Sequence, residues 1–195
     1  GLGLAADTPV VVVHQGASPT DMGAATRVYW TLKSLGVRDL AVLNGGFAAW
    51  AEAGLPVATG STAVAASDWQ PEWSDAWRVT TAEVEQLVAD GSARLIDARA
   101  PGFFLGTLCS IARPGTIRGA RNLFHEDWFD GTAMKPAAEL RAMATERVPA
   151  EGAPLTVSFC NTGHWASINW FVMSEVAGIP NTRLYAESMA EWTMA

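Results

Sequence analysis

The chain has 195 residues, of which 49% are hydrophobic and 17% charged, a composition that excludes intrinsic disorder. Thirteen Lys and Arg against twenty Asp and Glu give a net charge of −7, which argues against a nucleic-acid-binding protein. No apolar run reaches the ~18 residues of a membrane-spanning helix. Two cysteines, Cys109 and Cys160, with three histidines, are too few for a disulfide scaffold or a sulfur-rich metal site.

The first part of the chain predicts a strand, a helix, a second strand and a short helix, in that order. These elements are expected at residues 10–13, 24–35, 40–43 and 47–53. Four consecutive valines make up the first strand, which is typical of a strand buried on both faces. A loop rich in Gly, Ser and Pro at residues 14–23 follows it, and Gly36 is a good stop for the helix.

Residues 55–78 have neither the periodicity of a helix nor that of a strand, and we expect them to be a linker. Three tryptophans, Trp69, Trp73 and Trp77, are set into this stretch. Large apolar rings are well suited to hold a connecting segment against the structure beside it. We therefore expect these side chains to act as anchors.

Strands and helices alternate again from residue 79. Thr80 followed by Glu83 has the pattern of a capping box that begins a helix. A long loop is expected at residues 99–116. Further strands are expected at residues 95–98, 155–159 and 183–185, and further helices at residues 136–145, at residues 166–177 and near Trp192. This alternation predicts an α/β protein with a mostly parallel sheet and helices on both faces.

The chain also repeats itself, which indicates tandem domains. Residues 35–43 match residues 177–185 at an offset of 142, and residues 10–14 match residues 155–159 at an offset of 145. The second copy has much more sequence ahead of the repeated unit, so we expect the front half of the first domain to lie outside this chain, in a separate docked chain or in further residues. The expected division is the C-terminal half of a first domain at residues 1–54, a linker at 55–78 and a second domain at 79–195.

Cys160 stands between an apolar strand and a helix, where backbone N–H groups converge at the positive end of the helix. A thiol placed there should ionise more readily than a free thiol. Gly163 permits the backbone conformation that a ring of inward-pointing amides needs. The residues alone leave open a reactive cysteine and a buried structural one.

Four motifs in the second copy resemble those of a rhodanese-type sulfurtransferase domain. They are residues 95–99, 115–123, 160–166 and 184–192, and residues 42–50 of the first copy match the last of them. The resemblance is to the tandem thiosulfate/3-mercaptopyruvate sulfurtransferases. It implies tandem α/β domains, each with a mostly parallel sheet and helices on both faces, of which the first is inactive because its loop has no cysteine.

The resemblance implies that Cys160 takes a sulfane sulfur from a small-molecule donor such as thiosulfate and holds it as a persulfide. The sulfur then passes to a thiophilic acceptor, cyanide or a thiol. Asp97 and Arg99 match a polar pair that orders the site. The loop cradle for the sulfur anion would be Asn161, Thr162, Gly163, His164, Trp165 and Ala166.

The resemblance implies no metal or organic cofactor. It leaves open 3-mercaptopyruvate as the donor, or a persulfide carrier or interaction module that serves a protein partner. A soluble protein of the cytoplasm or the bacterial periplasm fits equally well.

A phosphatase of the Cys-(x)5-Arg type is disfavoured, because it needs an arginine where Ala166 stands. A triad of Ser18, His14 and Asp21 is disfavoured because all three lie in one flexible loop.

The loop differs from that of thiosulfate enzymes, because it has no permanently charged residue and Phe103 stands where family members often carry a substrate-binding arginine. We therefore expect weak binding of thiosulfate. Protonated His164 would restore positive charge, and Trp165 would form an apolar wall or pack against the linker. Three arginines of the long loop and its end would also restore charge if that loop folds over Cys160: Arg113, Arg118 and Arg121.

Overall fold

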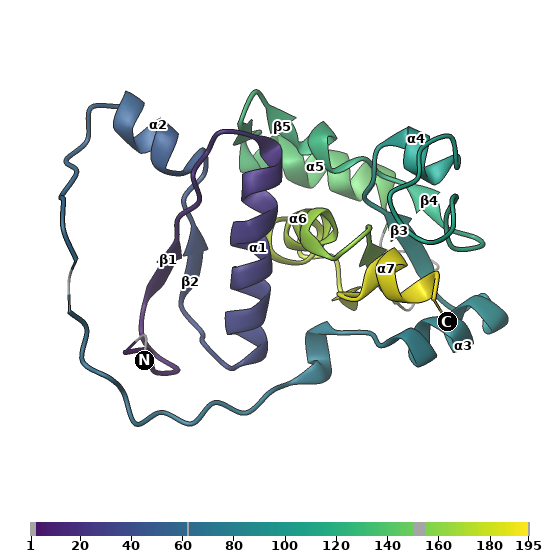
Figure 1. Ribbon diagram of the computed structural model, residues 1–195, viewed down its shortest axis with the longest axis horizontal. Helices are drawn as coiled ribbons and strands as arrows, with labels where there is room; N and C mark the ends of the chain where they lie inside the picture. The colour runs from purple at the N-terminus through teal and green to yellow at the C-terminus, as the bar shows by residue number, and fades with distance from the viewer. Residues whose placement is uncertain (1–2, 62, 150–154, 195) are drawn as a thin grey trace.

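The computed structural model describes residues 3–61, 63–149 and 155–194. The first part forms a unit of two parallel strands, β1 (Val10–Val12) and β2 (Leu40–Val42), with helices α1 (Pro19–Ser34) and α2 (Gly46–Glu52). The segment after α2 runs around the outside of the molecule to α3 (Figure 1). Its one regular turn is a short 3-10 helix, η1 (Asp75–Trp77), as far as the structure describes it.

The second part is built on a parallel sheet in the order β4-β3-β7-β8, which confirms the predicted α/β class. Its strands are β3 (Arg94–Asp97), β4 (Arg121–Asn122), β7 (Thr156–Phe159) and β8 (Thr182–Leu184). Its α-helices are α3 (Thr81–Asp90), α4 (Pro101–Phe104), α5 (Ala137–Arg147), α6 (His164–Phe171) and α7 (Ser188–Trp192). A 3-10 helix η2 (His125–Trp128), a small antiparallel pair β5 (Phe129–Asp130) and β6 (Ala133–Met134), and a π-helical turn η3 (Val172–Val176) complete it.

Three sequence-based expectations about these elements were wrong in detail. Helix α1 begins at Pro19, inside the predicted loop, because proline suits the first turn, where its missing N–H has no partner to lose. Helix α6 begins at His164 and gives way to the π-helical turn after Phe171. Strand β1 is not buried on both faces: Val11 is 61% exposed and Val13, just beyond it, is 52% exposed.

The units β1–α1–β2–α2 and β7–α6–β8–α7 make the same backbone hydrogen bonds. Leu43 N–H donates to Val12 O as Tyr185 N–H donates to Ser158 O. Phe47 N–H donates to His14 O as Met189 N–H donates to Cys160 O. When the two units are aligned by these bonds, residues of β1 correspond to residues of β7 at an offset of 146 rather than the predicted 145. His14 is therefore the counterpart of Cys160.

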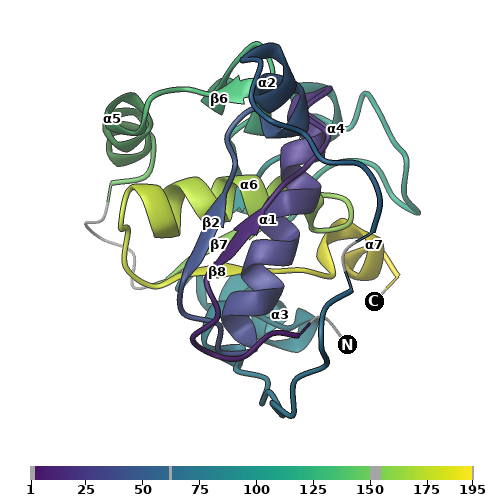
Figure 2. The same ribbon diagram turned by 90° about the vertical axis from the view of Figure 1, so that its left-hand side faces the viewer.

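Helices α1 and α6 cross in close contact and join the two units (Figure 2). The Thr26 and Ser167 hydroxyl oxygens are 2.7 Å apart, and a side chain on Gly23 would meet the His164 carbonyl. Further along, Glu175 accepts hydrogen bonds from Tyr29 Oη at 2.9 Å and from Lys33 Nζ at 2.8 Å. Because small residues let the backbones approach, α1 lies directly behind the start of α6.

The linker is held against α1 by two of its three tryptophans. Trp73 meets the Trp30 ring edge-on with centroids 5.3 Å apart, and the Trp30 Nε1–H donates to Trp77 O at 2.9 Å. The predicted anchoring by a tryptophan side chain is thus confirmed for Trp73, and for Trp77, whose ring meets the Trp170 ring of α6 edge-on with centroids 6.3 Å apart. The capping box is also confirmed, because the Thr80 side chain and Glu83 satisfy each other's backbone N–H groups. No helix in the described ranges is long and apolar enough to cross a membrane.

Candidate active site

Cys160 lies at the carboxyl end of β7 and is 1% exposed. Three contacts fix it. Its backbone N–H donates to Ser188 Oγ at 3.1 Å, its carbonyl accepts from Met189 N–H at 3.0 Å, and its Sγ accepts from Gly163 N–H at 3.0 Å. An N–H directed at the sulfur stabilises negative charge there. The thiol is therefore placed in a turn at the start of α6 where a backbone N–H and the positive end of the helix both favour negative charge.

Gly163 makes this turn possible. Its φ of 87° and ψ of −10° are left-handed, a conformation that costs little only for glycine. The space that a Cβ would occupy is also filled, by the Arg27 guanidinium and the Ala186 carbonyl. A side chain at this position would both strain the backbone and displace Arg27.

The predicted pair of Asp97 and Arg99 lies behind the loop and is almost completely buried. Arg99 Nε donates to Asp97 Oδ1 at 2.9 Å and its Nη2 to Oδ2 at 2.6 Å. Thr116 Oγ1 donates to the same carboxylate at 2.7 Å. The Arg99 Nη1 donates to Asn161 Oδ1 at 3.2 Å, so the end of β3 positions the residue that follows Cys160.

A pocket of ≈ 330 Å³ opens beside Cys160. Its other lining residues are Thr20, Ser110, Ile111, Asn161, Thr162, His164 and Trp165. Five of the predicted cradle and nucleophile positions thus meet at one surface. Of the remaining two, Gly163 lies buried beneath the loop, and Ala166 is buried in α6 with its carbonyl accepting from Ser158 Oγ at 2.9 Å.

Trp165 forms a wall of this pocket and contacts other residues than the linker. Its ring stacks on His125 with centroids 4.7 Å apart, and the Phe103 ring lies 6.5 Å away. Its Nε1–H donates to Thr20 Oγ1 at 3.3 Å. The wall therefore joins α6, α4, η2 and the first turn of α1.

None of the residues that line the pocket is Lys, Arg, Asp or Glu. Arg113 donates instead to the carbonyls of Thr193 and Trp192, and Arg118 and Arg121 are exposed away from the lining. Burial, and then the charge of Arg27, lower the pKa of His164 below 6.5. The expected sources of positive charge in the long loop are thus not at the pocket, and His164 is neutral at pH 7.

Sequence reasoning missed several residues that shape the site, because they come from distant segments. Thr20 lies on α1, Ser110 and Ile111 on the loop after α4, and Ser188 at the start of α7. Ser188 has a φ of 55°, which is uncommon outside glycine and aims its hydroxyl at Cys160 N–H. The described residues contain no group of three His, Cys, Asp or Glu that could hold a metal.

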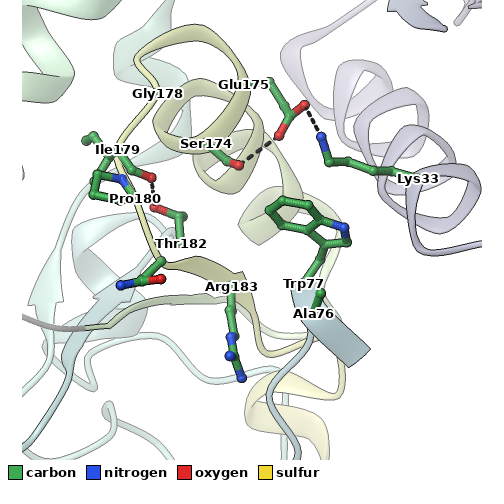
Figure 3. Close-up of a pocket in the computed structure, with 11 residues that line it drawn as sticks. Lys33, Ala76, Trp77, Ser174, Glu175, Gly178, Ile179, Pro180, Thr182 and Arg183 are labelled. Carbon is green, nitrogen blue, oxygen red and sulfur yellow. Dashed lines mark hydrogen bonds and ion pairs between the residues drawn. The ribbon is translucent and has the colours of Figure 1, made fainter. Parts of the chain in front are cut away.

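A second pocket of ≈ 480 Å³ lies between the C-terminal end of α1, η3 and β8 (Figure 3). Lys33 and Glu175 meet at one side of it and form an ion pair at 2.8 Å. Lys33 also lies 4.5 Å from the centroid of the Trp77 ring. Lys33 and Glu175 neutralise each other, so neither side chain offers an unpaired charge to a ligand in this pocket.

Comparison with known proteins agrees with this fold. The model of the rhodanese-like domain matches residues 80–195. The mouse thiosulfate sulfurtransferase is 30% identical over 199 residues, which cover 98% of this chain and 65% of that protein. The human 3-mercaptopyruvate sulfurtransferase is 27% identical over 197 residues, covering 99% and 65%. The Thermus thermophilus sulfur carrier protein TtuD is 28% identical over 208 residues, covering 98% and 70%.

Solved structures share the fold. The 3-mercaptopyruvate sulfotransferase SseA from Escherichia coli has a TM-score of 0.79 at 22% identity, over 95% of this chain and 68% of that one. The anaerobic ergothioneine biosynthesis enzyme from Chlorobium limicola has a TM-score of 0.82 at 21% identity, over 100% and 51%. The α/β sheet and the matched domain define the class: the chain belongs to the rhodanese-like domain family. It spans 61% and 66% of two further relatives, from Synechococcus elongatus and Pseudomonas aeruginosa.

Proposed function

We propose that this chain carries the catalytic site of a sulfurtransferase and that Cys160 is its nucleophile. The observation that carries the proposal is the Gly163 N–H donated to Cys160 Sγ at 3.0 Å, at the floor of a pocket. Relatives named thiosulfate and 3-mercaptopyruvate sulfurtransferase support it. A buried structural cysteine would need neither a pocket nor a directed donor.

The reaction would take two displacement steps. The Cys160 thiolate attacks the outer sulfur of the donor, the donor's S–S or C–S bond breaks, and the leaving group departs with that electron pair. For thiosulfate the leaving group is sulfite. Cyanide or a thiolate then attacks the outer sulfur of the Cys160 persulfide, forming thiocyanate or a new persulfide, and the Cys160 thiolate leaves. The Gly163 N–H stabilises the Cys160 thiolate, which attacks in the first step and leaves in the second.

The pocket lining favours a donor that is not bound through a cluster of fixed charges. Trp165 and Ile111 offer apolar surface, and the lining has no Lys or Arg. We therefore propose weak binding of thiosulfate, with 3-mercaptopyruvate as the second donor candidate. A persulfide carrier that serves a protein partner is the third candidate, supported by the similarity to the Thermus sulfur carrier protein.

Intact-mass measurement tests these candidates. The chain is incubated with thiosulfate or with 3-mercaptopyruvate, and we expect a gain of one sulfur atom that cyanide then removes. The Cys160→Ser chain should gain none. No gain with either donor, but a gain from a persulfidated protein, would favour the carrier. No gain under any condition would contradict the proposed function.

We also propose that the chain is part of a tandem protein, with an inactive half-domain at residues 1–54, a linker at 55–78 and the catalytic domain at 79–195. The matching hydrogen bonds of the two units support this. Strand β7 has β3 on its second edge, whereas β1 pairs only with β2 in the described part of the chain. A further strand and helix, in the same or a docked chain, would cover that edge.

A further inference from the structure

Arg27 packs its guanidinium against the back of the Cys160 loop. It lies on α1, outside the matched domain. Its Nη1 donates to Ala186 O at 3.4 Å, and its guanidinium carbon lies 5.0 Å from the centroid of the Trp30 ring. The same Nη1 occupies the place that a Cβ on Gly163 would take. Arg27 therefore touches the residue whose N–H binds the sulfur of Cys160.

The charge of Arg27 has no carboxylate within 4.0 Å among residues 3–61, 63–149 and 155–194. The negative charge of Glu187 favours the protonated form of Arg27, but Glu187 is already ion-paired with Arg78. Burial lowers the pKa of Arg27, and the charges of Glu187 and then Cys160 raise it. A partly buried cation without a close partner is costly, and an anion at Cys160 relieves that cost.

The other charged groups around the loop do not take this role. Arg99 is neutralised by Asp97 in a buried bidentate pair. His164, at the start of α6, is kept neutral in part by the charge of Arg27 itself. Arg78 and Glu187 lie on the Ala186 side and neutralise each other. Arg27 is thus the cation at the back of this loop that is not held in an ion pair in the part described.

We propose that Arg27 is a positioning residue whose fixed charge stabilises the anionic sulfur of Cys160 through the Gly163 turn. This inference rests on the proposed function, since it concerns the thiolate and persulfide of that reaction. It explains how a cradle loop without permanent charge holds an anion. It also gives the first unit, whose loop has no cysteine, a direct part in the chemistry of the second.

The test uses the Cys109→Ser chain, in which Cys160 is the single thiol. The rate of iodoacetamide alkylation is measured against pH for Arg27→Gln, Arg27→Met, Arg27→Lys and the control Arg38→Gln, an exposed arginine beyond α1. Glutamine keeps a hydrogen-bond donor but has no charge. Two uncharged variants are included so that failure of one to fold does not end the experiment, and thermal unfolding is recorded for each.

We expect the alkylation midpoint to rise by about half a pH unit or more in the uncharged variants, because a nearby cation favours the thiolate. Arg27→Lys should keep most of the effect, and Arg38→Gln should match the parent. Equal midpoints for Arg27→Gln and Arg38→Gln, or equal shifts for Arg27→Gln and Arg27→Lys, would overturn the proposal and leave Arg27 a structural contact. Alkylation needs no sulfur donor, so a parent chain that never gains sulfur would reject the proposed function without deciding the role of Arg27.

Discussion

The Trp165 indole lies flat on the His125 imidazole, with ring centroids 4.7 Å apart and planes 9° from parallel. His125 is 1% exposed, and its Nδ1 lies 3.0 Å from the Ala98 carbonyl, which can only accept. Burial lowers the pKa of His125 to about 4, so the ring is neutral at pH 7 and carries its proton on Nδ1. A buried, neutral histidine thus packs against Trp165, which forms one wall of the pocket beside Cys160.

This histidine predicts a loss of stability in acid. Below pH 6.5 the unfolded chain binds a proton at His125, whereas the folded chain does so only near pH 4. Stability should therefore fall as pH drops from 6.5 towards 4, by ~1–3 kcal/mol from this group. His125→Gln should reduce the difference between urea unfolding free energies at pH 7.5 and pH 5. His164→Gln, at an exposed histidine, is the control and should change it less.

Loss of sulfur transfer in Cys160→Ser, with a normal far-ultraviolet spectrum, is the second prediction. Two of the three contacts that fix Cys160 use its backbone N–H and carbonyl, so they remain when the thiol is replaced. Cys109 is exposed and its S–H donates to Ile111 O at 3.1 Å, so Cys109→Ser should retain most activity. Both are measured as thiocyanate or sulfide release. If Cys109→Ser proved equally inactive, a two-cysteine mechanism would replace ours.

His164 should make no charged contribution above pH 6.5. Burial and the charge of Arg27 lower its pKa below the ordinary value of 6.5, so less than half of it is protonated at pH 6.5 and the fraction falls as pH rises. We expect the pH–rate profiles of the parent and of His164→Ala to have the same shape from pH 6.5 to 8.5. Activity that rises on acidification in the parent but not in His164→Ala would show that His164 supplies charge to the donor.

The buried ion pair of Arg99 and Asp97 should be necessary for both stability and activity. Arg99→Met leaves a buried carboxylate without its main partner, which should cost about 3–5 kcal/mol of unfolding free energy. It also removes the donor to Asn161, so turnover of the folded fraction should fall. Thr116→Val removes a single hydrogen bond to the same carboxylate and should cost only about 1 kcal/mol. Equal losses in urea unfolding would contradict this ranking.

Much of the fold follows from local patterns. The alternation of apolar runs predicted β3, β7, β8 and α3, because each has a buried face or a capping box within a few residues. The strands β4, β5 and β6 have only two residues each, too few for an alternation of apolar and polar residues to appear. The π-helical turn after Phe171 has no signal in residue order, and neither does the hydrogen bond by which its Glu175 contacts Tyr29 of α1.

From the residues alone the site was predictable only where it is local, and the distant pair of Asp97 and Arg99 was expected only from the family resemblance. Cys160 and its loop are consecutive, so the motif contains them. The residues that complete the pocket, such as Thr20 and Ile111, come from other segments, and no spacing rule relates them to Cys160. Arg27 is an ordinary helix arginine in the sequence, and only the crossing of α1 over α6 brings it to Gly163. Long-range packing, rather than propensity, supplies this information.

The last prediction concerns the free edge of β1. Val11 and Val13 are exposed, and with Leu43, Phe47, Trp50 and Val57 they line an apolar groove of ≈ 470 Å³. An unpaired edge with apolar side chains associates with other chains. The 195-residue chain by itself should therefore bind a hydrophobic dye and self-associate at micromolar concentration. Val11→Lys should reduce both, whereas Leu105→Lys, at a leucine 71% exposed elsewhere, should not.

Denaturing mass measurement of the protein from its natural source should then show a species larger than 20.7 kDa or a second segment that co-purifies with this one. That extra polypeptide should protect the β1 amides from hydrogen exchange, as β3 does for β7. A single 20.7 kDa species that is monomeric, well folded and free of dye binding would show that the first unit is stable without a covering strand. The proposed tandem arrangement would then be wrong.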